Sequence, residues 1–174
     1  RIVWETNEIK QDTATKGFHN ITLTLKSIDK TAKILTDIFG YELISQENNR
    51  FRFATNAVEN ASIVDLLEEP NGKPGYNAAG TNHHVAFRVP KEEVLMNFRE
   101  KILTENLGIT PKINRDYFFS LYFREPGGVL FELATDNPGF TVDEPLAELE
   151  TNLKLPKQYE NSRELIENTL PKLI

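Results

Sequence analysis

Apolar and polar residues alternate in short segments, and the order of these segments occurs twice along the chain. In the first copy, residues 18–26 alternate as in a half-buried strand, and residues 28–39 carry apolar side chains at helical spacing. Three further strand-like segments follow, at 41–45, 50–54 and 61–67. The pattern predicts a βαβββ module at residues 16–67.

The same order returns after residues 68–82, which are rich in proline, glycine and asparagine and which we interpret as a linker. Residues 83–89 alternate as a strand, and apolar positions between 94 and 102 predict a second helix. Strand-like segments follow, at 110–114, 117–124 and 128–134. A second βαβββ module is therefore predicted at residues 83–134.

Each module alone leaves one face of its sheet without a partner. We therefore expect an α+β protein in which the paired modules form a cup-shaped mixed sheet, with polar positions facing inward. Residues 135–174 are predicted to be a C-terminal extension with a helix near 160–170. We expect this extension to cover the exterior of the sheet.

Composition and charge remove several classes of protein. With 39% hydrophobic residues, the 174-residue chain can bury a core, which excludes wholesale disorder. A net charge of −6 without a basic run disfavours nucleic-acid binding. The absence of cysteine excludes disulfides, thiolate zinc sites and a cysteine nucleophile. Because no apolar run could span a membrane and the first residues do not resemble a secretory signal, we expect a soluble, cytoplasmic protein.

The candidate chemistry lies in the histidines and in one glutamate. Side chains on a strand point alternately to its two faces. The apolar residues of 83–89 share a face with His83, so His84 is predicted to face into the cup. The alternation around Glu132 places it on the same side. An imidazole and a carboxylate that meet there would be a metal-ligand pair, while His19 and His83 would point towards helices or the exterior.

Alignment of the two copies does not supply a third ligand of equal quality. His19 aligns with His83, and the residue that aligns with His84 is Asn20, a weak ligand at best. Asp65 aligns with Glu132 and could also face the cup. From the residues alone, the chain offers two convincing ligands.

Three motifs connect the chain with a known family. GFHNITL, TNHHVAFRVP and RDYFFSLYFREPGGVLFELATDNPGFTVDEP resemble sequences of the vicinal oxygen chelate superfamily, which includes glyoxalases, bleomycin-resistance proteins and extradiol dioxygenases. Within it, residues 16–174 resemble the C-terminal half of hydroquinone-type ring-cleaving dioxygenases. The resemblance implies a four-module protein of which this chain is half.

The resemblance also implies a site. In that family two histidines and one glutamate hold Fe(II), and the matching residues here are His84 and Glu132. The other histidine comes from an N-terminal half, so this chain alone is expected to bind metal weakly or not at all. Tyr122 and Arg115 match residues that act beside the metal. The implied substrates are O2 and a small aromatic compound of the hydroquinone type, and Mn(II) or another divalent metal stays possible.

Two other functions remain open. A glyoxalase-like lyase or isomerase would use a divalent metal without O2 and would need more carboxylates, which Asp65 could add to Glu132. A non-enzymatic module would bind an aromatic compound in the cup without metal. The assembly is equally open: we slightly favour a homodimer, or pairing with an N-terminal half, over a compact monomer in which both modules share one cup.

Overall fold

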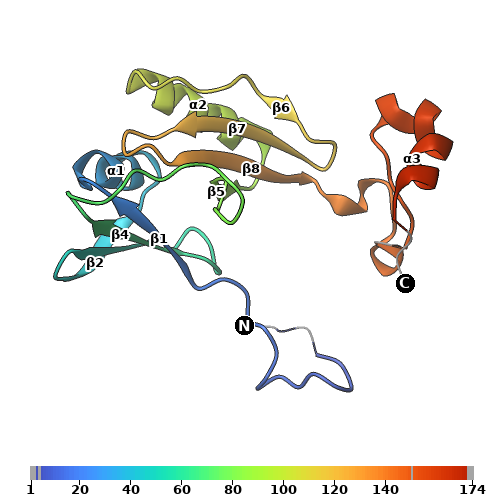
Figure 1. Cartoon of the computed structure of the whole chain (residues 1–174), viewed down its shortest axis with the longest axis horizontal. Coiled ribbons are helices and arrows are strands. Elements are labelled where there is room, and N and C mark those ends of the chain that lie inside the picture. The colour runs from blue at the N-terminus through green and yellow to red at the C-terminus, as the bar shows by residue number, and fades with distance from the viewer. Residues whose placement is uncertain (1–2, 4, 150, 172–174) are drawn as a thin grey trace.

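The computed structural model describes residues 3, 5–149 and 151–171, and its body consists of two four-stranded mixed sheets with helices (Figure 1). The first sheet contains β1 (Asn20–Leu25), β2 (Glu42–Glu47), β3 (Arg50–Ala54) and β4 (Ile63–Glu68), in the order β1-β4-β3-β2. Between β1 and β2 lie the helix α1 (Asp29–Lys33) and the π-helical turn η1 (Ile34–Ile38). In each module the first strand is parallel to the last, and the other pairs are antiparallel.

The second sheet repeats this topology. It contains β5 (Val85–Val89), β6 (Ile113–Asn114), β7 (Phe118–Arg124) and β8 (Leu130–Pro138), in the order β5-β8-β7-β6. The helix α2 (Glu92–Thr104) connects β5 to β6. The predicted α+β fold of paired βαβββ modules is confirmed, and the two sheets do not close into a barrel. The strand predicted at 110–114 is reduced to two residues, and β8 continues four residues beyond its predicted end.

Each sheet has one apolar and one polar face, as the alternation predicts. In β1, Leu23 and Leu25 are buried while Thr22 and Thr24 are exposed. The apolar faces of both sheets and their helices share one hydrophobic core. Phe39, at the end of η1, reaches the second module, where its ring centroid lies 4.5 Å from that of Phe87. Burial of these faces holds the modules together, since apolar surface leaves water when it packs.

A buried carboxylate also joins the two modules. Glu125, in the turn between β7 and β8, is only 2% exposed. Its Oε2 accepts hydrogen bonds from Thr31 Oγ1 of α1 at 2.5 Å and from the Gly127 amide at 2.7 Å, and its Oε1 accepts one from the Val129 amide at 2.7 Å. A Cβ at Gly127 would lie 2.7 Å from both Leu25 Cδ2 and Thr31 Oγ1, so this close approach requires glycine.

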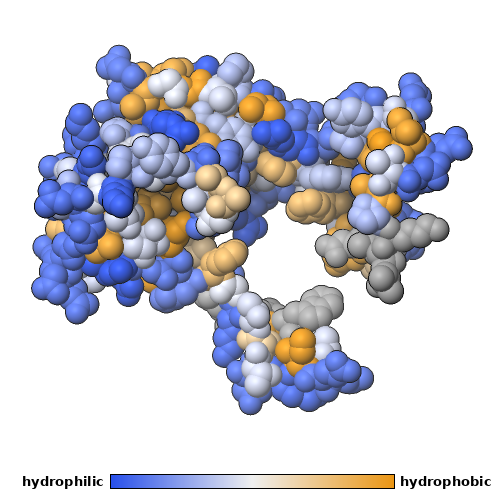
Figure 2. Space-filling view, in the orientation of Figure 1, coloured by the Kyte–Doolittle hydropathy of each residue, from blue (hydrophilic) through white to orange (hydrophobic). Residues whose placement is uncertain are grey.

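The C-terminal extension forms helices but does not cover the sheets, so that part of the prediction is wrong. The helix expected near 160–170 is present as η4 (Lys157–Ser162) and α3 (Arg163–Thr169), preceded by η2 (Phe140–Val142) and η3 (Leu146–Glu148). Figure 1 shows the extension projecting from the end of β8, and Figure 2 shows it as a separate lobe. Its base is fixed by the Phe140 ring, which stacks on Tyr117 with centroids 5.1 Å apart. The exposed leucines Leu146 and Leu165 show that alternation within a segment cannot predict what that segment packs against.

Within the described ranges, no helix is both long and apolar enough to cross a lipid bilayer.

Candidate metal centre

The candidate centre lies on the polar face of the second sheet, around the central strand β8. Glu132 is opposite Ala86 of β5 on one side and opposite Tyr122 of β7 on the other. Because β8 is paired on both sides, the backbone of Glu132 is fixed. The small side chain of Ala86 leaves room above the strand, into which His84 can reach from the start of β5.

His84 and Glu132 lie in direct contact. The distance from His84 Nε2 to Glu132 Oε2 is 2.7 Å, and the Glu132 side chain is only 5% exposed, against 32% for His84. The predicted proximity is therefore present in the structure, whereas the assignment of both residues as metal ligands stays a prediction. A buried carboxylate requires partners, and Glu132 has one on each oxygen.

The second partner of Glu132 is Tyr122. The Tyr122 hydroxyl donates a hydrogen bond to Glu132 Oε1 at 2.6 Å, and its ring lies edge-on to that of His84 with centroids 5.7 Å apart. Burial, and then the hydrogen bond to Glu132, raises the pKa of Tyr122 above its usual value. The phenol therefore keeps its proton near neutral pH and remains a donor to the carboxylate.

Arg115 is the fourth predicted residue that the structure brings to this place. It precedes β7, and its Cζ lies 5.6 Å from the centroid of the Tyr122 ring, which is a cation–π distance. The guanidinium adds positive charge beside Tyr122, whose hydroxyl binds the Glu132 carboxylate. His84, Tyr122, Glu132 and Arg115 thus form one chain of contacts, with two members from the β6–β7 region, one from just before β5 and one from β8.

The two remaining histidines lie differently from each other. His19 is exposed and lies just before β1, as predicted. His83 is exposed as well, in agreement with the predicted direction towards helices or the exterior, and its Nδ1 lies 2.9 Å from His84 Nδ1, a contact that the sequence analysis did not predict. Both histidines lie just before β5, which begins at Val85, so strand alternation alone does not determine how close their rings come. The adjacency of two histidines was the signal that could have indicated this contact.

The corresponding place on the first sheet contains a different cluster. Asn20 Nδ2 donates to Asp65 Oδ2 at 2.9 Å, as the alignment of Asn20 with His84 and of Asp65 with Glu132 would suggest. Arg52 occupies the ladder position that Tyr122 has in the second sheet, and its Nε donates to Asp65 Oδ1 at 2.8 Å. The Arg52 hydrogen bond is the main reason that the pKa of Asp65 lies below its usual value.

Asp65 is therefore paired with arginine on its own sheet. Among the described residues, no hydrogen bond or ion pair connects this cluster with His84 or Glu132. Sequence reasoning missed Arg50 and Arg52, because charged residues on a strand usually indicate a solvated face.

The donor set fits part of a divalent metal site. An imidazole nitrogen and a carboxylate oxygen are suitable ligands for Fe(II), Mn(II) and similar ions, and here they converge on one point. In residues 3, 5–149 and 151–171, no group of three histidine, cysteine, aspartate or glutamate side chains is placed to hold a metal. Among the described residues, His84 and Glu132 are thus two candidate ligands, one fewer than the three that a facial triad needs.

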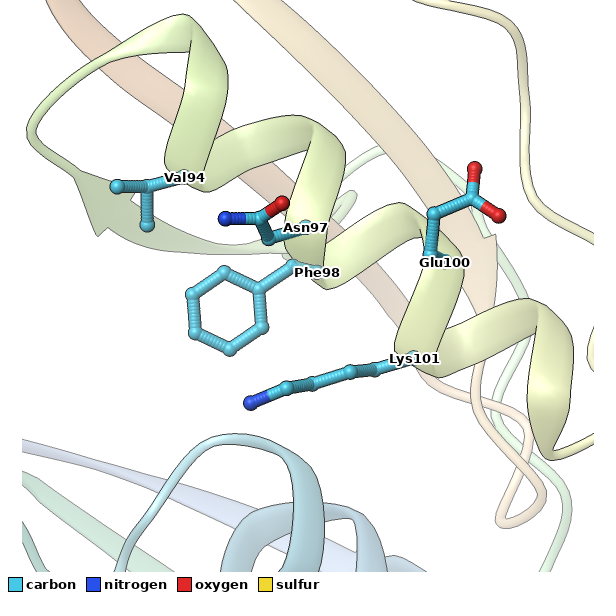
Figure 3. Close-up of a pocket in the computed structure, with 5 residues that line it drawn as sticks. All are labelled: Val94, Asn97, Phe98, Glu100 and Lys101. Carbon is cyan, nitrogen blue, oxygen red and sulfur yellow. The ribbon is translucent and has the colours of Figure 1, made fainter.

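A pocket elsewhere does not belong to this centre. It measures about 450 Å³ and is lined by one face of α2, namely Val94, Asn97, Phe98, Glu100 and Lys101 (Figure 3). Since α2 packs on the apolar side of the second sheet, this pocket and the His84–Glu132 pair lie on opposite sides of that sheet.

Comparison with known proteins places this geometry in a family. Residues 17–133 match the model of the Glyoxalase/Bleomycin resistance protein/Dioxygenase superfamily. MhqO and MhqE of Bacillus subtilis (strain 168), both provisionally named ring-cleaving dioxygenases, are 40% and 41% identical over 96% and 98% of this chain. A chlorohydroquinone/hydroquinone 1,2-dioxygenase of Sphingobium indicum is 30% identical over 96% of it. The chain spans about half the length of these relatives, 53%, 55% and 53% respectively.

Solved structures of other proteins share the fold of this chain. A Bacillus subtilis subsp. subtilis str. 168 protein, provisionally named a dioxygenase, is 38% identical to this chain. It superposes with a TM-score of 0.90 over 99% of this chain and 55% of the Bacillus protein. The fosfomycin resistance protein FosX of Listeria monocytogenes superposes with a TM-score of 0.57 at 22% identity, a likeness that concerns the fold alone.

Proposed function

The chain belongs to the glyoxalase/bleomycin resistance protein/dioxygenase superfamily, and on that premise we propose that it is the C-terminal part of an Fe(II)-dependent ring-cleaving dioxygenase. Its substrates would be hydroquinone-type phenols and O2. The observation that carries the proposal is the direct contact of His84 with Glu132 on a polar sheet face, beside Tyr122. The names of the relatives support the reaction class.

His84 and Glu132 are the residues that would hold the metal. The third protein ligand would come from another segment, either an N-terminal half of a longer polypeptide or a second copy of this chain, since the relatives are about twice as long. Bound Fe(II) supplies a redox-active Lewis acid that brings an electron-rich aromatic ring and O2 together.

Tyr122 and Glu132 act as a unit in this proposal. The Tyr122 hydroxyl holds Glu132 Oε1, which leaves Oε2 directed towards His84 as the ligand oxygen. A hydrogen-bond donor to the ligand carboxylate fixes its orientation and tunes its basicity. Tyr122 has one hydroxyl proton, which its raised pKa retains, and this proton would pass to an oxygen of the substrate only when the hydrogen bond to Glu132 opens.

Arg115 contributes charge. Its guanidinium, a delocalised cation, lies over the Tyr122 ring. We propose that it favours the ionised form of a phenolic substrate and stabilises negative charge that develops on oxygen during ring attack. Neither role requires Arg115 to bind the metal.

The lyase or isomerase alternative loses support because Asp65, the extra carboxylate it needed, is paired with arginines on the other sheet. The binding-module alternative keeps one supporting observation: His84 and Glu132 satisfy each other at 2.7 Å, so an aromatic compound could bind beside them without metal. Oxygen consumption distinguishes the functions.

Because the third ligand would come from another segment, the test uses the longer polypeptide that this proposal implies, loaded anaerobically with one equivalent of Fe(II), freed of unbound metal and given hydroquinone in an oxygen electrode. We expect O2 uptake coupled to loss of the aromatic absorbance, and no uptake in His84→Ala or Glu132→Ala. Arg88→Gln, a substitution on the same sheet face at an arginine paired with Asp136, should leave uptake unchanged. Turnover without O2 would favour the lyase, and hydroquinone binding without metal or turnover would favour the binding module.

A further inference from the structure

The polar face of the first sheet carries an arginine pair held by a buried carboxylate. Asp65 in β4 is fully buried, with an exposed fraction of 0%. Arg52 binds it through Nε to Oδ1 at 2.8 Å and through Nη2 to Oδ2 at 2.9 Å. Arg50 Nη1 donates to Asp65 Oδ2 at 3.2 Å and to Thr22 Oγ1 at 2.9 Å. Both guanidinium groups are thereby fixed next to each other.

These contacts leave much of the donor capacity unused. Within the described part of the chain, Arg50 donates hydrogen bonds through Nη1 and none through Nε or Nη2, and Arg52 donates none through Nη1. The two side chains are 40% and 36% exposed, so these N–H groups are accessible from the solvent side of the sheet. Two guanidinium charges against one carboxylate leave the cluster with a net charge of one positive unit.

The two sheets differ in the groups that bind their central carboxylate. On the second sheet, the central carboxylate Glu132 has a phenol and an imidazole as partners, and neither partner is a permanent cation. On the first sheet, the guanidinium of Arg52 supplies the cation from the chain itself. The first face is therefore closed to a metal and instead attracts an anion.

We propose that Arg50 and Arg52 form an anion site that binds a carboxylate group. Two guanidinium groups in fixed orientation match the planar, two-oxygen geometry of a carboxylate. Their fixation by Asp65 and Thr22 means that little side-chain entropy is lost when the anion binds. The proposal does not depend on the metal centre or on the dioxygenase reaction.

The neighbouring groups set the strength of the site. In the β2–β3 ladder, Ser45 lies opposite Arg52 and Glu47 lies opposite Arg50. Glu47 is exposed and makes no ion pair with Arg50 in the described structure. Its charge should weaken binding of an external anion, so Glu47→Gln should strengthen it by about threefold, the effect expected of one exposed charge.

The experiment is a titration of the ¹⁵N-labelled chain with sodium acetate at constant ionic strength, followed through the Nε–H signals of the arginines. We expect the Arg52 signal to shift in a saturable manner. Arg50→Gln should weaken binding by about tenfold or more, because a charge-assisted hydrogen bond is lost. Arg88→Gln, at a more exposed arginine of the other sheet that is likewise paired with an aspartate, is the control and should leave the titration unchanged.

Three results would overturn the proposal: a shift that does not saturate, an equal shift with chloride, or an unchanged titration in Arg50→Gln with its amide spectrum intact. Should Arg50→Gln unfold, Arg50→Lys keeps the charge but removes the planar donor pair, and it should also weaken binding. The source of the carboxylate is distinguished by sedimentation. Acetate binding by a monomer indicates a small-molecule ligand, whereas acetate that dissociates self-associated chain indicates a carboxylate side chain of a second copy.

Discussion

Replacement of Thr31 by valine tests how strongly the two modules depend on each other. Valine has almost the same shape as threonine but lacks the hydroxyl that donates to Glu125 Oε2 at 2.5 Å. Both Thr31, at 0%, and Glu125, at 2%, are buried, so water cannot replace the lost donor. Glu125 would keep its two backbone donors, the amides of Gly127 and Val129.

The expected loss follows from this geometry. A hydrogen bond to a charged group contributes about 1.5–3 kcal/mol, and removal of one partner leaves the desolvated carboxylate oxygen undersatisfied. We therefore expect Thr31→Val to lower the free energy of unfolding by about 1.5–3 kcal/mol. Since Thr31 lies in the first module and Glu125 in the second, the loss weakens the interface between modules as well as α1.

Urea denaturation followed by circular dichroism measures this loss. Thr36→Val is the matched control, because Thr36 lies in the adjacent helical turn and its hydroxyl donates to the exposed Asp37. The control should change stability by less than about 0.5 kcal/mol. If Thr31→Val also stays within that limit, the buried hydrogen bond does not hold the modules together and the reasoning is refuted.

Further predictions concern the metal centre, Asp65 and the C-terminal extension. Tyr122→Phe should weaken Mn(II) binding about 10- to 100-fold, because Glu132 loses the hydroxyl that orients its carboxylate; equal affinity in an EPR titration would contradict this role. Because the folded-state pKa of Asp65 is lowered below its ordinary 3.8, its stabilising contribution is present above that value and lost as the pH falls through the folded-state pKa. Unfolding free energy measured between pH 6 and about pH 2 should therefore fall less steeply in Asp65→Asn than in the native chain, and equal slopes would refute this contribution. Leu165→Asp should leave thermal stability within about 0.5 kcal/mol of the original, since Leu165 is 70% exposed, and a larger loss would show that the extension packs on the body.

Local pattern was sufficient to predict much of the fold. The strands of both modules follow from alternation, because the direction of a side chain on a strand depends only on its position along that strand. The same local rule predicted that His84 and Glu132 share a face, and the pairing of Ala86 with Glu132 in the β5–β8 ladder brings the nearby His84 within reach of the carboxylate. His83 and His84 both precede β5, so the contact between them was not predicted by alternation.

Contacts between distant segments could not be read from the sequence. Thr31 and Glu125 are 94 positions apart, and their hydrogen bond exists only once the modules have packed. The pairing of Arg52 with Asp65 looks, in sequence, like two ordinary surface charges, and only the β3–β4 register places them opposite each other. The position of the C-terminal extension relative to the sheets depends on contacts with distant residues. The spacing of apolar residues within the extension does not determine those contacts.

The central claim is that His84 and Glu132 are ligands of a divalent metal, and pulsed EPR of Mn(II) tests it most directly. With the chain in excess over Mn(II), the account predicts modulation from one coordinated imidazole nitrogen that disappears in His84→Ala and persists in His19→Ala and His83→Ala. Absence of nitrogen modulation at saturating chain, or its loss in His19→Ala with retention in His84→Ala, would contradict the account.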